Sequence, residues 1–169
     1  MAFTLGACSK KSSKPKPRYG KLEPVSIKHE IANFTILLPF TRGVIKHKGR
    51  IQINLGKAEA SAPIREGLNI RLTPWPKDAN QARKEAILFG DIVRNKRDGS
   101  IWLVEQKRET GDSRSHTVVI YHKLPGKTGK EAALQCTGSY TDLRRKGLRK
   151  FNPSVVPIFE KMCRSIKLK

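Results

Sequence analysis

The sequence predicts an α+β fold: an antiparallel sheet with one central helix and a C-terminal helix, behind a basic disordered N-terminal arm. Two observations carry this prediction. Short segments with alternating apolar and polar residues recur along the chain, which is typical of strands with one solvated face. The order of strands, one capped amphipathic segment, more strands and a terminal amphipathic segment favours antiparallel pairing with few helices.

The N-terminal arm comprises residues 1–24. Its segment 9–24 is rich in Lys and Ser, and Pro15, Pro17 and Pro24 disfavour a helix. We expect an extended or disordered arm, followed by a single α+β domain over residues 25–169 with a basic C-terminal region. The arm is either a solubilising tail or a segment that lies on an acidic partner, and the basic character of the whole chain favours the second function.

Three predicted strands open the domain. Residues 31–38 (IANFTILL) are the first, and Gly49 precedes the second at 50–55, where apolar and polar residues alternate strictly. Residues 68–72 repeat this alternation. Both alternating segments indicate half-buried strands, and the stiff Pro74-Trp75-Pro76 turn follows them.

The clearest predicted helix follows this turn. Asp78 can cap it, and Gln81 completes a capping box three residues later. Gly90 is typical of the residue just beyond a helix end. The predicted apolar face comprises Ala79, Ala82, Ala86 and Phe89, widened by Ile87.

Strands return after this helix. Residues 91–95 and 100–106 predict a hairpin around Lys96–Gly99, because Asp98-Gly99 is a strong turn signal. Two further predicted strands span 117–123 and 132–140. The segment Pro153–Pro157 then introduces a C-terminal helix, whose apolar residues favour docking on the sheet over lying on a membrane.

The charge of the chain indicates its class of partner. The sequence has 35 Lys and Arg against 14 Asp and Glu, a formal net charge of +21. The cationic excess is +5 in residues 1–24, +7 in 25–122 and +9 in 123–169. Self-repulsion of this size opposes a compact state unless a polyanion neutralises it. We therefore expect nucleic acid, a nucleic acid–protein complex or an anionic membrane as partner.

Clustered cations are the candidate contacts with that partner, because each can neutralise a phosphate and release counterions. No aromatic RNA-recognition motif is present, so we expect recognition of a backbone or surface rather than of bases. Tyr19, Tyr121 and Tyr140 could stack on bases, although strand tyrosines more often pack in a core. The candidate binding residues are Lys10, Lys11, Lys14, Lys16, Arg18, Lys21, Lys46, Lys48, Arg50, Lys127, Lys130, Arg144, Arg145, Lys146, Arg149 and Lys150.

The sequence contains no recognisable catalytic or metal-binding pattern. We therefore expect no catalytic residue, metal or cofactor, and expect the protein not to be an enzyme. Gly126-Lys127-Thr128 lacks the first glycine of a phosphate loop, since Tyr121 stands at that position. Histidines and cysteines do not have zinc-site spacing. The three cysteines, Cys8, Cys136 and Cys163, are far apart, and we expect reduced thiols in an intracellular protein.

Part of the chain resembles rhabdovirus matrix proteins. The resemblance rests on residues 83–93 (RKEAILFGDIV), the following basic turn, and 99–104 (GSIWLV). Residues 48–55 (KGRIQINL) are similar to the Lys-Gly-initiated strand of that family. Together they cover roughly residues 46–105.

The resemblance implies a structural virion protein that self-associates, condenses the ribonucleoprotein and links it to the anionic inner leaflet of the envelope. The implied partners are ribonucleoprotein or RNA, further copies in a homo-oligomeric lattice, the membrane and a viral glycoprotein tail. The implied location is beneath the envelope of the virion and in the host cytoplasm. The short length suits the plant-infecting, cytorhabdovirus-like members. Pro-Pro-x-Tyr and Pro-Thr-Ala-Pro budding motifs are absent from the sequence.

Two alternatives remain open. A ribosomal or organellar ribonucleoprotein subunit that binds RNA backbone has the same charge and tails but needs no self-association. A basic viral coat protein that packages nucleic acid would use the arm for RNA and a strand-rich body for a shell. The few predicted strands argue against an eight-stranded jelly roll.

Overall fold

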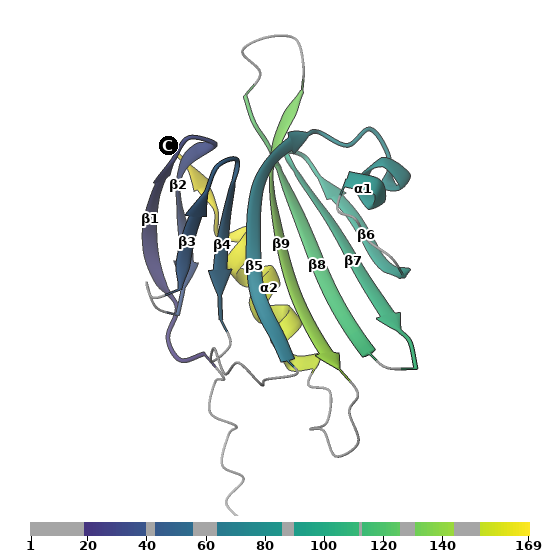
Figure 1. Ribbon diagram of the computed structural model, residues 1–169. Coiled ribbons are helices and arrows are strands. Elements are labelled where there is room, and N and C mark those ends of the chain that lie inside the picture. The colour runs from purple at the N-terminus through teal and green to yellow at the C-terminus, as the bar shows by residue number, and fades with distance from the viewer. Residues whose placement is uncertain are drawn as a thin grey trace, which may run out of the picture.

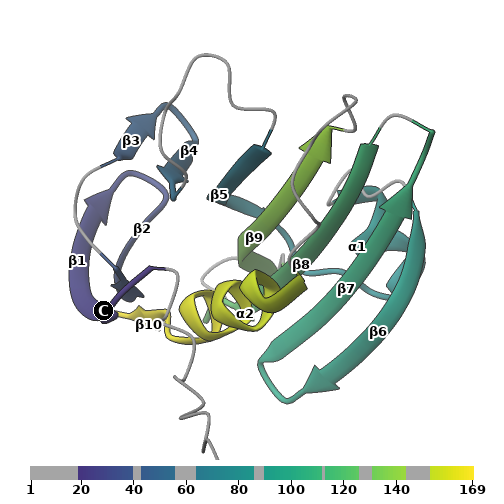
Figure 2. The same ribbon diagram turned by 90° about the horizontal axis from the view of Figure 1, so that it is seen from below.

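A curved seven-stranded antiparallel sheet dominates the computed structural model, which describes residues 19–39, 43–55, 64–85, 90–111, 113–125, 131–143 and 153–169. Helix α2 (Val156–Arg164) lies in the concavity of this sheet, beside a smaller three-stranded sheet (Figures 1 and 2). We call the sheet face that packs on α2 the inner face, and the opposite face the outer face.

The large sheet has the strand order β3-β4-β5-β9-β8-β7-β6, and the small sheet has the order β1-β2-β10. The strands are β1 Glu23–His29, β2 Ala32–Leu38, β3 Val44–His47, β4 Arg50–Asn54, β5 Ile64–Pro74, β6 Asp91–Asp98, β7 Ile101–Glu109, β8 Ser113–Lys123, β9 Ala132–Leu143 and β10 Lys167–Leu168. The helical elements are α1 Ala79–Glu85, a 3-10 turn Pro153–Val155 and α2.

The predicted antiparallel sheet and both predicted helices are present, but the fold contains more strand than the sequence indicated. Strands β1, β3 and β10 were missed. β1 includes Glu23 and Pro24, which the prediction assigned to the arm, and β3 includes Lys46 and His47, which belong to no predicted strand. These strands are short or rich in charged residues, so their pairing partners define them more than their own alternation does.

Helix α1 begins as predicted. The Gln81 backbone N–H donates to Asp78 Oδ1 at 2.7 Å, and the Gln81 side chain accepts from the Lys77 backbone N–H at 2.9 Å. Two orphan donors at the helix start are thereby satisfied. The described helix spans only seven residues, and the predicted continuation over 86–89 lies outside the described residues.

Consecutive residues of β8 show how the two helices divide the sheet. Tyr121 points to the outer face and donates a 2.7 Å hydrogen bond to the Ala82 carbonyl of α1. His122 points to the inner face, where its Nε2 donates to the Cys163 carbonyl of α2 at 2.8 Å. Since successive strand residues alternate in direction, α1 and α2 cover opposite faces.

The main core lies between the inner face and α2. Phe159 is fully buried against Gly138 of β9, and a Cβ built at Gly138 would lie 2.5 Å from Phe159 Cβ. The helix therefore approaches the sheet at a position where only glycine fits. The fully buried core also includes Phe34, Ile36, Leu38, Ile51, Ile53, Ile70, Val118, Ile120, Leu134 and Met162.

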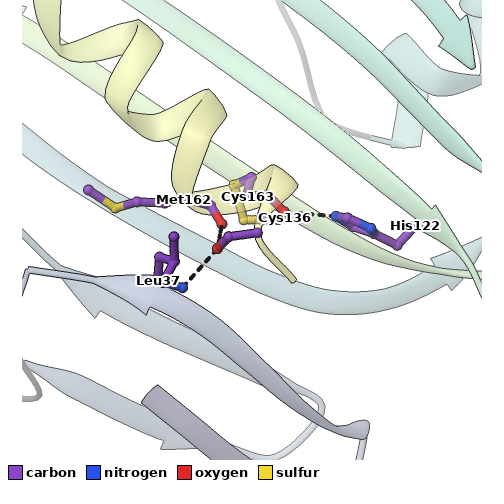
Figure 3. The surroundings of a disulfide bond; sticks show 6 residues. Leu37, His122, Cys136, Met162 and Cys163 are labelled. Atoms are coloured by element: carbon purple, nitrogen blue, oxygen red, sulfur yellow. Dashed lines mark hydrogen bonds between the residues drawn. A yellow bond between two sulfur atoms is a disulfide. The ribbon is translucent and has the colours of Figure 1, made fainter. Parts of the chain in front are cut away.

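A disulfide corrects the prediction that all cysteines are reduced thiols. Cys136 of β9 is bonded to Cys163 of α2, with a Cα–Cα distance of 5.6 Å (Figure 3). The two residues are 27 positions apart and match no paired-cysteine motif, so only the docking of α2 on β9 brings them together. Cys8 lies outside the described residues.

The small sheet is fastened to α2 at the same place. Ser165 Oγ, just beyond α2, accepts a 2.7 Å hydrogen bond from the Leu37 backbone N–H of β2. The same hydroxyl donates to the Met162 carbonyl at 2.5 Å (Figure 3). This hydroxyl and the pairing of β10 with β2 thus join the end of α2 to the small sheet.

We expect acid to weaken this packing through His122. Burial lowers the pKa of His122 below its ordinary 6.5; the hydrogen bond to Cys163 opposes this shift and Arg164 adds to it. The folded state holds the ring neutral while the unfolded chain takes up a proton. The free energy of unfolding therefore falls as pH drops below 6.5, by up to about 1.4 kcal/mol per pH unit until the folded-state pKa is reached.

The measurement is chemical denaturation at pH 7.5 and pH 5.5. The non-titrating variant His122→Asn is expected to be less stable at pH 7.5 but to lose less stability on acidification than the wild type. An equal pH dependence in both proteins would refute the role of His122.

Candidate anionic-ligand surface

Four of the predicted binding residues fall in the described part of the chain. Lys21 is exposed and lies 3.8 Å from Glu23. Lys46, Lys48 and Arg50 are exposed at the β3–β4 hairpin, where Gly49 at φ +74° makes the turn. Outside the described residues lie Lys10, Lys11, Lys14, Lys16, Arg18, Lys127, Lys130, Arg144, Arg145, Lys146, Arg149 and Lys150.

These four residues do not form one cluster. Lys46 pairs with Ile51 and so lies on the inner side of the β3 edge, whereas Arg50 pairs with His47 on the outer face. Arg50 instead belongs to a larger set of residues that crosses the outer face.

One continuous row of directly paired residues crosses the outer face on all seven strands of the large sheet. It joins Arg50 to Arg71 on β5, and Trp102 of β7 to Arg97 on the edge strand β6. We call it the outer-face row. In strand order from β3 to β6 it comprises His47, Arg50, Arg71, Gln135, Tyr121, Trp102 and Arg97.

Hydrogen bonds fix the middle of this row. Arg71 Nε donates to Gln135 Oε1, and Gln135 Nε2 donates to the Tyr121 hydroxyl at 3.1 Å. Tyr121 continues the chain to the Ala82 carbonyl. Gln135 is only 1% exposed, and these contacts satisfy its buried amide. The Arg71 guanidinium is therefore oriented by a core-anchored chain and is not a freely moving surface group.

The row has polar neighbours between β4 and β8. Asn69 is exposed and pairs with Gln52 and Thr137, and Ser139 pairs with Thr117. Hydroxyl and amide groups of this kind commonly contact phosphate and sugar oxygens. In Figure 1 no helix crosses β5 on this side, while α1 lies towards β6 and β7. Ala82 of α1 packs with Tyr121 of β8 and Ala133 of β9, so part of the outer face is covered.

Tryptophans and cations meet at the other end of the row. The Trp75 and Trp102 ring centroids are 6.0 Å apart, and the Arg97 guanidinium carbon lies 5.4 Å from each of them. Lys123 Nζ lies 5.7 Å from the Trp75 centroid and forms an ion pair with Glu131. We call these four residues, Trp75, Trp102, Arg97 and Lys123, the tryptophan–cation cluster.

The described strand carboxylates of the large sheet are confined to one face, whereas cations lie on both. Strand carboxylates lie on the inner face by register, and none lies on the outer face among the strand side chains that the structure describes. The inner carboxylates are Glu66, Asp91, Asp98, Glu105 and Glu109. The outer cations are Arg50, Arg71, Arg97, Arg108 and Lys123.

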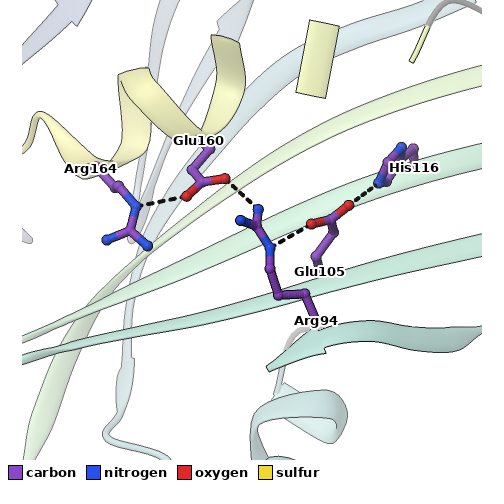
Figure 4. Close-up of polar contacts among 5 residues, drawn as sticks. All are labelled: Arg94, Glu105, His116, Glu160 and Arg164. Carbon is purple, nitrogen blue, oxygen red and sulfur yellow. Dashed lines mark hydrogen bonds and ion pairs between the residues drawn. The ribbon is translucent and has the colours of Figure 1, made fainter. Parts of the chain in front are cut away.

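Glu105 and Glu109 form ion pairs with cations of their own face, and Figure 4 shows the network around Glu105. Arg94 donates to Glu105 at 2.7 Å and also to Glu160 of α2, which in turn accepts from Arg164 at 2.8 Å. Glu105 also contacts His116 Nε2 at 2.6 Å. Burial by itself would raise the pKa of Glu160, but hydrogen bonds from Arg164 and Arg94 outweigh it and hold that pKa below 4.5. This network holds α2 to β6 and β7.

Comparison with known proteins gives no match to any family model, curated protein or solved structure. The surface must therefore be interpreted from its own chemistry. Its groups are donors and cations, which suit an anionic ligand.

The described residues contain no group of three or more His, Cys, Asp or Glu side chains arranged to hold a metal ion. None of their helices has the length and apolar character needed to cross a membrane.

Sequence patterns predicted only part of this surface. Arg71 was missed, although the alternation in 68–72 already put it on the polar side of its strand. Arg97 was assigned to a turn. Tyr121 and Tyr140 are buried at 0% and 1% exposure, so they pack in the core as strand tyrosines usually do and offer no stacking surface for bases.

Proposed function

We propose that this protein is a non-enzymatic binding component that holds the sugar–phosphate backbone of a nucleic acid on its outer sheet face. The observation that carries the proposal is the placement of charge: the described strand side chains of the outer face include cations and no carboxylate, whereas the inner face carries both. Cations without neighbouring carboxylates on such a face attract phosphates.

Dimensions support an extended ligand. Arg50 and Arg97 are separated by five inter-strand steps in the sheet order, about 24 Å at roughly 4.8 Å per step. A single small anion would use one end of the row only. The aromatic residues of the row are buried, so the exposed contacts are guanidinium, amide and hydroxyl groups, which position a backbone without reading bases.

Matrix function is the more specific form of this proposal. It adds self-association, condensation of ribonucleoprotein and linkage to an anionic membrane, and it rests on the resemblance of residues 46–105. Sedimentation at low and high salt, with and without RNA, tests it. Salt-reversible assembly of the pure protein is expected; a protein that stays monomeric at low salt and only binds RNA would favour the ribosomal-type alternative.

The outer face itself is tested by charge removal. Arg50→Gln/Arg71→Gln is expected to weaken binding to single-stranded RNA about tenfold or more at low salt. It should also make the slope of log K against log[salt] shallower by roughly 1.4, since each phosphate contact contributes about 0.7. Fluorescence anisotropy of a labelled oligonucleotide gives both quantities.

A matched control removes two lysines from the inner face. Lys96 and Lys107 lie on the same hairpin as Arg97 but pair with Leu103 and with Asp91 and His116 on the inner side. Lys96→Gln/Lys107→Gln should change the slope by less than half as much. Equal losses in the two double variants would show that net charge, not the outer face, binds RNA. Binding to phosphatidylglycerol vesicles with no binding to RNA would replace the nucleic-acid proposal with a membrane one.

A further inference from the structure

Arg97 in the tryptophan–cation cluster is placed to bind an anionic ligand. We propose that Arg97 forms an oxyanion subsite for one phosphate group, which the proposed function identifies as a phosphate of the bound nucleic-acid strand. The inference rests on that function for the source of the phosphate, but its geometry is independent of it.

Arg97 is held in place by the two indole rings. Its guanidinium carbon is equally distant, at 5.4 Å, from the centroids of Trp75 and Trp102. Both rings are almost fully buried, at 4% and 5% exposure, so they form a rigid support. Trp102 Nε1 donates a 2.5 Å hydrogen bond to Asn95 Oδ1, which fixes the ring beneath the guanidinium.

The indole rings can support the guanidinium without using its N–H donors. A guanidinium that stacks on an aromatic ring contacts it through its planar π-face. Its N–H groups then remain in the plane, in the fork that matches two oxygens of a phosphate. Immobilising the plane beforehand lowers the entropic cost of binding an anion there.

Of the two cations in the tryptophan–cation cluster, Arg97 is the one whose charge is not neutralised by a carboxylate of the described residues. Lys123, the other cation near Trp75, is neutralised by Glu131. Arg97 is exposed on edge strand β6, and in the part of the chain that the structure describes it forms no ion pair with a carboxylate. A cation that is oriented, exposed and unneutralised is suited to bind an oxyanion from solution.

The subsite carries its own reporter. Trp75 and Trp102 are the only two tryptophans of the chain, so all tryptophan emission comes from this cluster. We would titrate the full-length protein with unlabelled oligo(dT) while following tryptophan emission, and follow a labelled oligo(dT) by anisotropy in parallel. Inorganic phosphate, titrated separately, tests the subsite without a nucleic acid.

We expect the emission change and the anisotropy to share one midpoint. Arg97→Gln should weaken oligo(dT) binding about tenfold, the effect of losing a charge-assisted contact. It should also make the salt slope shallower by roughly 0.7. Lys96→Gln, which removes the neighbouring charge from the inner face, should leave both quantities near wild type. Circular dichroism melts confirm that both variants fold.

Separate results overturn the two proposals. If oligo(dT) binds but Arg97→Gln keeps the wild-type affinity and salt slope, the subsite is wrong and the proposed function stands. If no labelled strand binds, the proposed function is wrong. The subsite then stands only if inorganic phosphate changes the tryptophan emission of the wild type and not that of Arg97→Gln. If phosphate does not change the wild-type emission, the subsite is wrong as well.

Discussion

Replacing Cys136 and Cys163 together with alanine is expected to lower the melting temperature by roughly 10 °C. The disulfide closes a segment of 27 residues. The chain-entropy model assigns about 3.5 kcal/mol to a closed loop of this size, and 1 kcal/mol corresponds to about 2–4 °C in a chain of this length. Thermal unfolding followed by circular dichroism measures the effect.

Reductant provides the complementary test. Dithiothreitol should lower the melting temperature of the wild type towards that of the double variant and leave the double variant unchanged. Cys8→Ser is the control that removes a thiol without touching the bond. A wild-type transition that does not respond to reductant would mean that the bond is absent from the folded protein in solution.

Gly138→Ala is expected to destabilise the protein by about 2–3 kcal/mol, and Gly138→Val by more. The added Cβ would lie 2.5 Å from Phe159 Cβ and 2.9 Å from Phe159 Cγ, so α2 must move away from β9. Chemical denaturation measures the loss. Because α2 also carries Cys163, the Ala variant should in addition form the disulfide more slowly on refolding.

Gly111 offers a matched control for this substitution. A Cβ built there meets no atom within 4 Å, and its backbone does not adopt a positive φ. Gly111→Ala should be neutral or slightly stabilising, since it restricts the unfolded chain. Equal effects at Gly138 and Gly111 would contradict the close approach of α2 to the sheet.

Local pattern was sufficient to predict most of the strands and both helices. The alternation in 50–55 and 68–72 correctly put Arg50 and Arg71 on the polar side of their strands, and the Asp78–Gln81 pair gave the start of α1. These features depend on residues within a few positions of one another, so a single sequence contains them.

The order of the strands in the sheet could not be predicted from the sequence. After β5 the chain leaves the sheet through α1 and re-enters at the far edge, and the meander β6-β7-β8-β9 then returns to β5. Arg71 therefore meets Gln135, 64 positions away, and the outer-face row forms from residues of seven separate strands. A local sequence pattern cannot predict contacts between residues this far apart. For the same reason the pairing of Cys136 with Cys163 could not be predicted.

The disulfide also bears on where the protein folds. Stable disulfides form in oxidising compartments and on exposed surfaces of particles and cells, and they are rare in reducing cytosol. The predicted cytoplasmic location is therefore best tested together with the redox state of Cys136 and Cys163, by alkylating the native protein directly from its source.

The cross-link from β9 to α2 makes residues 136–163 a covalently closed ring that contains the densest basic run, Arg144–Lys150. A protease that cuts once inside the ring cannot release the C-terminal helix. The two fragments would migrate as one band without reductant and as two with it. The basic segment can thus be nicked, lengthened or replaced while both of its ends stay attached to the same folded body.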